Sequence, residues 1–333
     1  MNNQTPLVSV IMAVYNAQDY LKEAIDSILT QTYEDIELII VNDGSNDLSQ
    51  DIIEQFRIAD CRVVSFSHNN KGLPHSLNEC IKLSKGKYIA RMDADDISLP
   101  NRIEEQVRFM EVNPSVGVCG TWAEVFGGER RTIKHPVEHE ALKAKLLFNV
   151  CFVHPTVMIR RCTLINNNLT YNTNYVNSQD YKLWSELSKV TIMANIPKVL
   201  FRYRVSENSI TSITNKKNPE LRYNLSKGIY ESFLTELNLY NTEEEYKLHF
   251  NVGVKDRIKG EKINLNSLNL YFNKISKANK MNYDKIYLSE VLAFKFVAVV
   301  IFRLKIEPTL LFKCLFYKFF YLGLFGILKN HLK

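Results

Sequence analysis

The stretch LVSVIMAV, residues 7 to 14, is an almost unbroken apolar run that is rich in valine and isoleucine. Such a run is typical of a strand that is buried on both faces of a parallel sheet. A similar run, IELIIV, follows at residues 36 to 41, and shorter apolar stretches follow at 62 to 66 and 87 to 92. The sequence therefore predicts four strands, separated by segments long enough for helices.

The segments between these strands repeat apolar residues at the helical period. We expect Asp19 to cap the first helix and Gly86 to follow the end of the third. Four strand-helix units within about 95 residues indicate a doubly wound α/β domain, whose ligands bind at the carboxyl ends of its strands.

Polar residues fall where these strands end: at residues 15 to 16, 42 to 45, 69 to 72 and 93 to 96. Neither the glycine pattern G-x-G-x-x-G after the first strand nor the phosphate loop G-x-x-x-x-G-K-[ST] is present. Dinucleotide oxidoreduction and P-loop chemistry are therefore disfavoured, and a bound diphosphate would need a metal ion to hold it.

The fourth strand ends in Asp93-Ala94-Asp95-Asp96. Alternate positions of a strand face the same way, so Asp93 and Asp95 are predicted to share one space while Asp96 turns aside. Carboxylate oxygens together with diphosphate oxygens suit Mn²⁺ or Mg²⁺. The alternative is a solvated acidic turn. Arg91 lies on the same strand face, where it would either bind phosphate or, as we expect, pair with a carboxylate.

Five segments resemble one known family. Residues 8 to 47, VSVIMAVYNAQDYLKEAIDSILTQTYEDIELIIVNDGSND, are similar to the opening of the family 2 glycosyltransferases, inverting enzymes with the GT-A fold. GKYIARMDADD (86–96) resembles the family's D-x-D segment, and HPTVMIRR (154–161) resembles its acceptor-side strand. QDYKLWSEL (179–187) and VLFRYRVSENSIT (199–211) resemble the segments that carry the catalytic base and close the domain.

The resemblance implies a donor site for a nucleotide sugar. Ala13 and Tyr15 would frame the nucleobase, Asp43 would hydrogen-bond the uracil of a UDP-sugar, and Asp93 would reach the ribose. Lys71 lies in a loop where the family often places a basic residue against the base or the diphosphate.

The resemblance also implies that Asp95 is the metal ligand and that Asp180 is the catalytic base. Asp180 would begin a helix, where an ionised carboxylate is favoured by about 0.3–1 kcal/mol, although such residues commonly only stabilise helices. Gln179 stands where the family commonly has Glu, and Val205-Ser206 follows Arg204 where family members often have a histidine that some use as a metal ligand.

Two aromatic residues within these segments each have two possible roles. His154 is either a structural histidine or a substrate contact. Trp184 either stacks on an acceptor sugar or, as Trp beside an apolar residue more often does, belongs to the core.

The composition is that of an ordinary globular chain: 333 residues, 46% of them hydrophobic and 23% charged. Six cysteines without a C-x-x-C pattern, and a start that lacks a basic region before an apolar one, predict a cytoplasmic protein. From residue 280 onward nine Lys or Arg stand against three Asp or Glu, an excess that equals the net charge of +6. The rest of the chain is near neutral, which disfavours nucleic acid as a partner.

These patterns predict a GT-A catalytic domain at residues 1–211 and a smaller helical region at 212–333. The segment at about 287–328 is apolar and aromatic but interrupted by basic residues, and its longest uncharged run has ten residues. A spanning helix needs about 20 residues, so this segment is predicted to lie on the inner face of the cell membrane. The alternative is that its apolar face packs on the catalytic domain or on a second copy of the chain.

The sequence is thus interpreted as a bacterial, Mn²⁺- or Mg²⁺-dependent inverting glycosyltransferase. It would move a hexose from a UDP-sugar to a glycan or lipid-linked acceptor during surface polysaccharide synthesis. Two alternative classes are a sugar-phosphate nucleotidyltransferase, which would need a glycine-rich basic loop after the first strand, and an inactive nucleotide-sugar-binding adaptor of the membrane.

Overall fold

The computed structural model describes residues 8–128, 130–205, 219–304, 314 and 317–331. The chain divides into two compact units, one formed by residues 1–139 and 152–216 and the other by residues 140–151 and 217–333. The boundary predicted at residue 211 lies outside the described residues. Segment 140–151, which belongs to the second unit, is a feature that the sequence patterns did not indicate.

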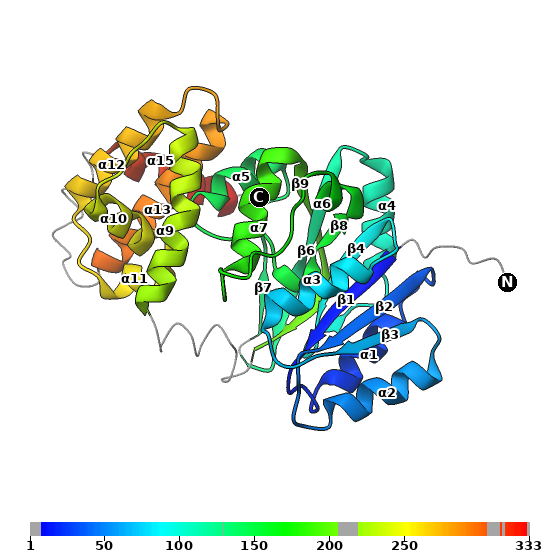
Figure 1. Ribbon diagram of the computed structural model, residues 1–333. Coiled ribbons are helices and arrows are strands. Elements are labelled where there is room, and N and C mark those ends of the chain that lie inside the picture. Colours follow the sequence, from blue (N-terminus) through cyan, green and yellow to red (C-terminus); the bar gives the residue numbers. More distant parts are fainter. Residues whose placement is uncertain (1–7, 129, 206–218, 305–313, 315–316, 332–333) are drawn as a thin grey trace. The chain divides into compact units, whose positions relative to one another are not determined.

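The first unit alternates strands and helices up to its fourth strand and then becomes more irregular (Figure 1). Its elements in chain order are β1 (Val8–Val14), α1 (Leu21–Leu29), β2 (Ile36–Asn42), α2 (Ser49–Ala59), β3 (Val63–Ser67), α3 (Leu73–Leu83), β4 (Tyr88–Asp93), β5 (Ile97–Ser98), α4 (Arg102–Val112), β6 (Val116–Phe126), β7 (Arg131–Ile133), the short 3₁₀ helix η1 (His154–Thr156), β8 (Met158–Arg160), α6 (Arg161–Asn166), α7 (Gln179–Val190) and β9 (Ile192–Arg204).

Within the described residues the strands form one mixed sheet in the order β3-β2-β1-β4-β8-β6-β9-β5, with β7 paired to β6. The first four strands are parallel, and β8 pairs antiparallel with both β4 and β6. β1 lies between β2 and β4, so the strand order reverses there, and ligands of open α/β sheets bind at such a point. The predicted α/β class with a helical C-terminal region is confirmed.

Two predicted helix ends are wrong. Helix α1 is preceded by Tyr20 rather than capped by Asp19, because the Ala17 carbonyl already accepts hydrogen bonds from the Tyr20 and Leu21 amides. Helix α3 ends at Leu83 and is followed by Ser84 in extended backbone, and Gly86 donates its amide proton to Ser9 Oγ at 2.8 Å. In both places a backbone or side-chain partner outside the usual cap pattern satisfies the polar groups.

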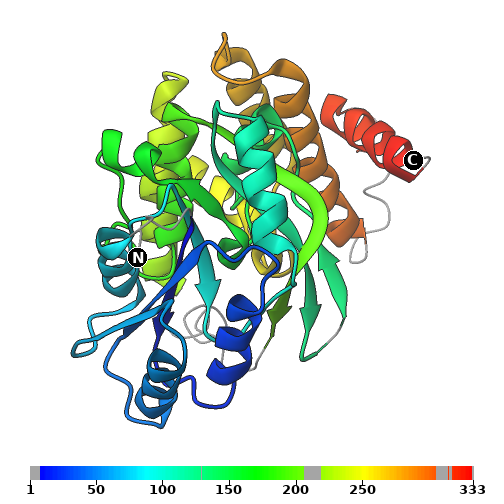
Figure 2. The same cartoon turned by 90° about the vertical axis from the view of Figure 1, so that its right-hand side faces the viewer.

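The second unit is helical within its described residues. Its elements are α5 (His139–Leu146), α9 (Pro219–Glu236), α10 (Glu243–Gly253), α11 (Lys255–Gly260), α12 (Leu265–Ala278), α13 (Lys285–Leu304) and α15 (Lys318–His331). Helices α13 and α15, orange and red in Figure 2, lie side by side. The core of this unit is aromatic: Phe272 packs against both Phe148 and Phe319. No helix in the described part of the chain is long and apolar enough to cross a membrane.

Candidate active site

An acidic cluster lies where β4 ends and the chain turns toward β5. One carboxylate oxygen of Asp93, of Asp95 and of Asp96 lies within 4.8 Å of the other two. The prediction that Asp96 turns aside is therefore wrong. The strand ends at Asp93, and the turn that follows does not keep the two-residue alternation of a strand.

The three carboxylates differ in environment. Asp96 is only 1% exposed, whereas Asp93 and Asp95 are partly exposed. Burial, and then the charge of Asp93, raise the pKa of Asp95 to about 6. Burial, and then the charges of its two neighbours, hold the pKa of Asp96 well above its usual value. Oδ2 of Asp96 is buried and has no hydrogen-bond partner among the described residues.

A buried arginine lies beside this cluster. Arg91 forms an ion pair with Asp93, which confirms the predicted pairing. Burial disfavours the charged guanidinium, but the charge of Asp93 and their hydrogen bond outweigh this and raise the pKa of Arg91. Arg102, fully buried in α4, donates to the Arg91 carbonyl at 2.7 Å and so fixes the last residues of β4.

The arginine that ends β9 was missed as part of this site. Nε of Arg204 donates to the Asp95 carbonyl at 2.7 Å, and Nη2 donates to Glu23 Oε2 at 2.6 Å. The preceding residue, Tyr203, has a raised pKa because of burial and the three nearby aspartates. The only sequence signal that Tyr203 and Arg204 belong to this site was their position in VLFRYR, within the segment that resembles the one closing the family's domain.

Asp180 lies in the first turn of α7, as predicted. Its Oδ1 accepts the Tyr181 amide proton at 2.7 Å. Burial raises the pKa of Asp180, while Arg91 acts in the opposite direction and Asp93 adds to the rise. Because Arg91 and Asp93 both act on Asp180, the start of α7 and the end of β4 belong to one electrostatic site.

A tyrosine that the sequence did not reveal links these groups. Tyr171 is 1% exposed, and burial together with the charges of Asp180 and Asp93 raises its pKa. Its hydroxyl lies 2.8 Å from Nε2 of His154, whose pKa is held well below its usual value by burial and by Arg91. The neutral imidazole is thus engaged by protein, as the structural interpretation of His154 predicted.

Trp184 is fully buried, and its ring lies 5.8 Å from His154 and 5.3 Å from Phe152. It therefore belongs to the core, as its sequence context favoured, and does not stack on a ligand.

The predicted nucleotide residues lie on β1, directly after it, on the loops after β2 and β3, and at the end of β4. Ala13 is the sheet partner of Asp93 in β4 and of Val41 in β2, and it is followed by the half-exposed Tyr15. The buried Asp43 carboxylate accepts the amide protons of Lys71 and Gly72 at 2.8 and 2.9 Å. The Lys71 side chain is exposed.

Asp43 therefore joins the loop after β2 to the loop after β3. Gly44, at φ +71°, lies so close to that second loop that a Cβ atom there would be 2.7 Å from the Asn70 amide nitrogen. Since each carboxylate oxygen has two lone pairs, Asp43 keeps acceptor capacity for a ligand.

Comparison with known proteins identifies the family. The sequence pattern of Glycosyl transferase family 2 matches residues 9–169. An uncharacterized glycosyltransferase of Haemophilus influenzae is 35% identical over 248 residues, which cover 70% of this chain and 76% of that protein. The O-antigen biosynthesis glycosyltransferase WbnJ of Escherichia coli is 33% identical over 212 residues, which cover 61% of this chain and 81% of that protein.

Two solved structures share the fold. One is residues 1–349 of S. aureus TarS in complex with UDP-GlcNAc, with a TM-score of 0.61, 17% identity, and coverage of 88% of this chain and 87% of that one. The other is the mannosyltransferase PcManGT of Pyrobaculum calidifontis in complex with GDP-Man and Mn²⁺, with a TM-score of 0.54, 14% identity, and coverage of 92% and 89%.

Proposed function

The chain belongs to glycosyl transferase family 2, and on that premise we propose that it transfers a hexose from a UDP-sugar, with inversion, to a hydroxyl of a glycan or lipid-linked acceptor in surface polysaccharide synthesis. The observation that carries this proposal is the cluster of Asp93, Asp95 and Asp96 beside the buried Arg91, together with Asp180, whose pKa is influenced by both Arg91 and Asp93. The E. coli relative named for O-antigen biosynthesis supports the proposed pathway class.

The proposed donor site extends from β2 across β1 to β4. Ala13 and Tyr15 would frame the base, and the remaining acceptor capacity of Asp43 would meet the uracil imide. Asp93 would accept from the ribose hydroxyls, and Lys71 would lie against the base or the diphosphate. Structures of this fold that contain UDP-GlcNAc or GDP-Man support a nucleotide-sugar donor, with UDP as our proposal for this chain.

A divalent cation fits the acidic cluster. Three carboxylates lie within 4.8 Å; a buried oxygen of Asp96 has no partner in the described part of the chain, and the pKa of Asp95 is raised to about 6. These carboxylates repel each other and favour a bound cation. We propose that Asp95 is the principal ligand and that Mn²⁺ or Mg²⁺ occupies this place. When bound, the ion neutralises charge on the departing diphosphate. The Mn²⁺ in the PcManGT structure supports this assignment.

The proposed chemistry is a single displacement at the anomeric carbon. The acceptor oxygen forms a bond to that carbon, its proton passes to the Asp180 carboxylate, and the bond to the diphosphate oxygen breaks so that UDP leaves with the electron pair. The raised pKa of Asp180 makes it a stronger base than an exposed aspartate. Each carboxylate oxygen has two lone pairs, so Oδ1 of Asp180 can accept the Tyr181 amide proton while the carboxylate keeps capacity to accept the proton of the acceptor hydroxyl.

We also propose that the helical unit attaches peripherally to the cytoplasmic face of the membrane. Fewer apolar side chains of this unit are available to contact the membrane than the sequence of the segment at about 287–328 suggested. Seven apolar residues of α13 are buried, and Lys295 and Arg303 donate to backbone carbonyls of the same unit. The candidate contacts are the exposed apolar side chains of α13 and α15: Ile286, Phe294, Ile301, Tyr321, Leu322 and Leu324.

The donor assignment is tested by thermal shift with a panel of nucleotide sugars, each with and without Mn²⁺. A ligand that binds only the folded protein raises its melting temperature. We expect UDP-sugars to raise it more than GDP- or CMP-sugars do, and only when Mn²⁺ is present. A larger shift with a GDP- or CMP-sugar would assign that nucleotide as the carrier in place of UDP. Shifts that do not depend on Mn²⁺ would contradict the metal assignment.

A further inference from the structure

A cavity of about 620 Å³ that takes no part in the proposed function opens in the helical unit. Its walls come from α10, from the segment that joins α11 to α12, and from α12. The volume lies within the range of small-molecule sites, roughly 300–1,000 Å³. Every lining residue belongs to the second unit, whereas the proposed donor site belongs to the first.

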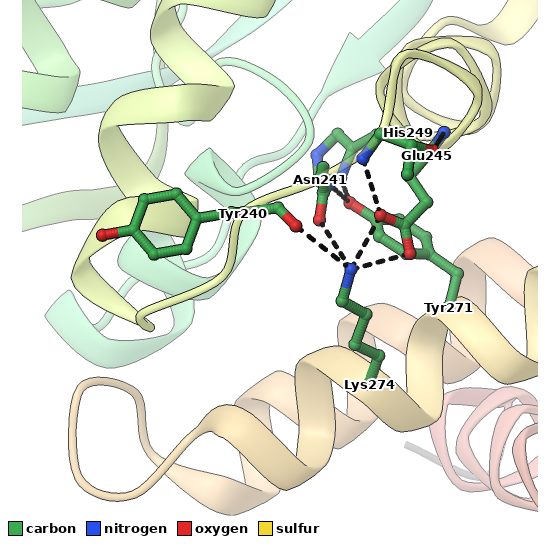
Figure 3. Close-up of polar contacts among 7 residues, drawn as sticks. Tyr240, Asn241, Glu245, His249, Tyr271 and Lys274 are labelled. Atoms are coloured by element: carbon green, nitrogen blue, oxygen red, sulfur yellow. Dashed lines mark hydrogen bonds and ion pairs between the residues drawn. The ribbon is translucent and has the colours of Figure 1, made fainter.

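One wall is held by a hydrogen-bond network (Figure 3). Lys274 Nζ lies 2.7 Å from both carboxylate oxygens of Glu245, and Tyr271 lies beside them. The Tyr271 hydroxyl is 2.7 Å from Asn241 Nδ2 and 2.8 Å from His249 Nδ1.

The proton positions in this network follow from its partners. Burial lowers the pKa of His249 to about 3, so the ring is neutral. Its Nε2 is 2.7 Å from the Leu147 carbonyl and must carry the proton, so Nδ1 accepts from the Tyr271 hydroxyl. The hydroxyl in turn accepts from Asn241, whose oxygen lies 3.4 Å from Lys274 Nζ. Each group has a partner, so this wall is fixed before a ligand arrives.

The charges around the cavity balance. Its walls hold three carboxylates and three ammonium groups: Glu244, Glu245, Glu261, Lys247, Lys262 and Lys274. Glu245 pairs with Lys274, and Glu261 pairs with Arg257 at 3.0 Å. A nucleotide or another strongly charged ligand gains little from such a surface, whereas a neutral polar ligand finds donors and acceptors close together.

An apolar surface adjoins these polar groups. The buried Ile263, the partly exposed Leu248 and the 70%-exposed Leu270 line the cavity together with the amide of Asn251 and the hydroxyl of Ser267. A saccharide ring combines a face of C–H groups with a rim of hydroxyls. The cavity offers apolar side chains for the C–H face and hydrogen-bonding groups for the hydroxyls.

We propose that the cavity between α10 and α12 binds a saccharide unit of the acceptor glycan, in a unit other than the one that holds the residues proposed to carry the chemistry. The proposal rests on the proposed function only for the origin of that saccharide. A second point of attachment would retain a growing glycan between transfers by raising its effective concentration.

The test is saturation-transfer NMR on the full chain, with methyl hexosides and methyl N-acetylhexosaminides as probes. Ser267 is exposed on α12 and lines the cavity, so Ser267→Trp should fill it and weaken binding at least tenfold. Lys277→Trp, at an exposed position of α12 that does not line the cavity, is the matched control and should bind as the wild type does. Leu270→Ala should weaken binding without filling the cavity.

Binding that survives both Ser267→Trp and Leu270→Ala, or a wild-type protein that binds none of the probes, would overturn the proposal. Release of UDP from a UDP-sugar is measured on the same samples to separate the two claims. Saccharide binding without turnover contradicts the proposed function alone, and turnover without saccharide binding contradicts the cavity assignment alone.

Discussion

The backbone amide of Arg204 donates a 2.7 Å hydrogen bond to Oδ1 of Asp96, although 108 residues separate the two in the chain. With the bond from Arg204 Nε to the Asp95 carbonyl, the end of β9 holds the acidic turn at two points. The pair with Glu23 fixes the guanidinium in turn. The closing segment of the first unit thus positions the carboxylates that are proposed to hold the metal.

Arg204→Ala should therefore lower Mn²⁺ affinity by about 10- to 100-fold, the usual cost of losing an outer-shell partner of a metal ligand. The amide bond to Asp96 would remain, but the bond to the Asp95 carbonyl and the pair with Glu23 would be lost. Isothermal titration with Mn²⁺ measures this. Arg202→Ala, on the same strand but paired with Glu124, is the control, and equal affinities for the two variants would contradict the assignment.

Asp95→Asn should abolish Mn²⁺ binding and, in the metal-free protein, raise the melting temperature at pH 7. The pKa of Asp95 is raised from 3.8 to about 6, so between these values the folded state binds more protons than the unfolded state and stability falls as the pH rises. At pH 7 the ionised Asp95 therefore lowers the free energy of unfolding by about 1–2 kcal/mol, after allowance for its partial exposure. Asparagine, which does not ionise, removes this loss of stability. Calorimetry of the wild type and of Asp95→Asn, with and without Mn²⁺, tests this prediction. A melting temperature of metal-free Asp95→Asn below that of the metal-free wild type would contradict the charge repulsion.

Asp180→Asn should lower turnover by about 10²-fold or more while leaving donor affinity nearly unchanged, as expected for loss of a general base. Because the pKa of Asp180 is raised, wild-type activity should fall as the pH falls through that raised value. This acid limb should vanish from the residual activity of the variant. A large loss of UDP-sugar affinity with little loss of turnover would instead make Asp180 a binding residue.

Membrane attachment is tested with point variants, because deletion from residue 291 onward would remove buried α13 residues such as Leu292 and Phe296. Replacing the exposed Phe294 and Ile301 by serine should release the protein from vesicles that contain anionic lipid, and high salt should weaken wild-type attachment. Ile58→Ser, at an apolar position of the first unit that is 74% exposed, is the control. If the double variant floats with the vesicles as the wild type does, these side chains do not contact lipid.

The parallel half of the sheet was predictable from sequence because each of its strands is a buried apolar run, which is a local signal. The sequence also placed Asp180 at a helix start and Arg91 beside Asp93, since both follow from short-range periodicity. These features need no knowledge of distant contacts.

The contributions of Tyr171 and Arg204 could not be predicted, because each depends on contacts that are made across the fold. The Tyr171 backbone is held by the Asn78 side chain, 93 residues earlier in the chain. The burial of Asp96 likewise depends on β9, and the packing of segment 140–151 with later helices depends on the aromatic core around Phe148. No periodicity of the local sequence encodes these contacts.

Release of UDP from UDP-hexoses by the wild type, Asp95→Asn and Asp180→Asn, each measured with and without Mn²⁺, tests the proposed metal-dependent transferase most directly. We expect Mn²⁺-dependent release by the wild type with at least one UDP-hexose. We also expect no Mn²⁺ stimulation in Asp95→Asn and a rate lower by about 10²-fold or more in Asp180→Asn. Wild-type protein that releases UDP from none of these donors, or Asp180→Asn protein that releases it at the wild-type rate, would contradict the proposed function.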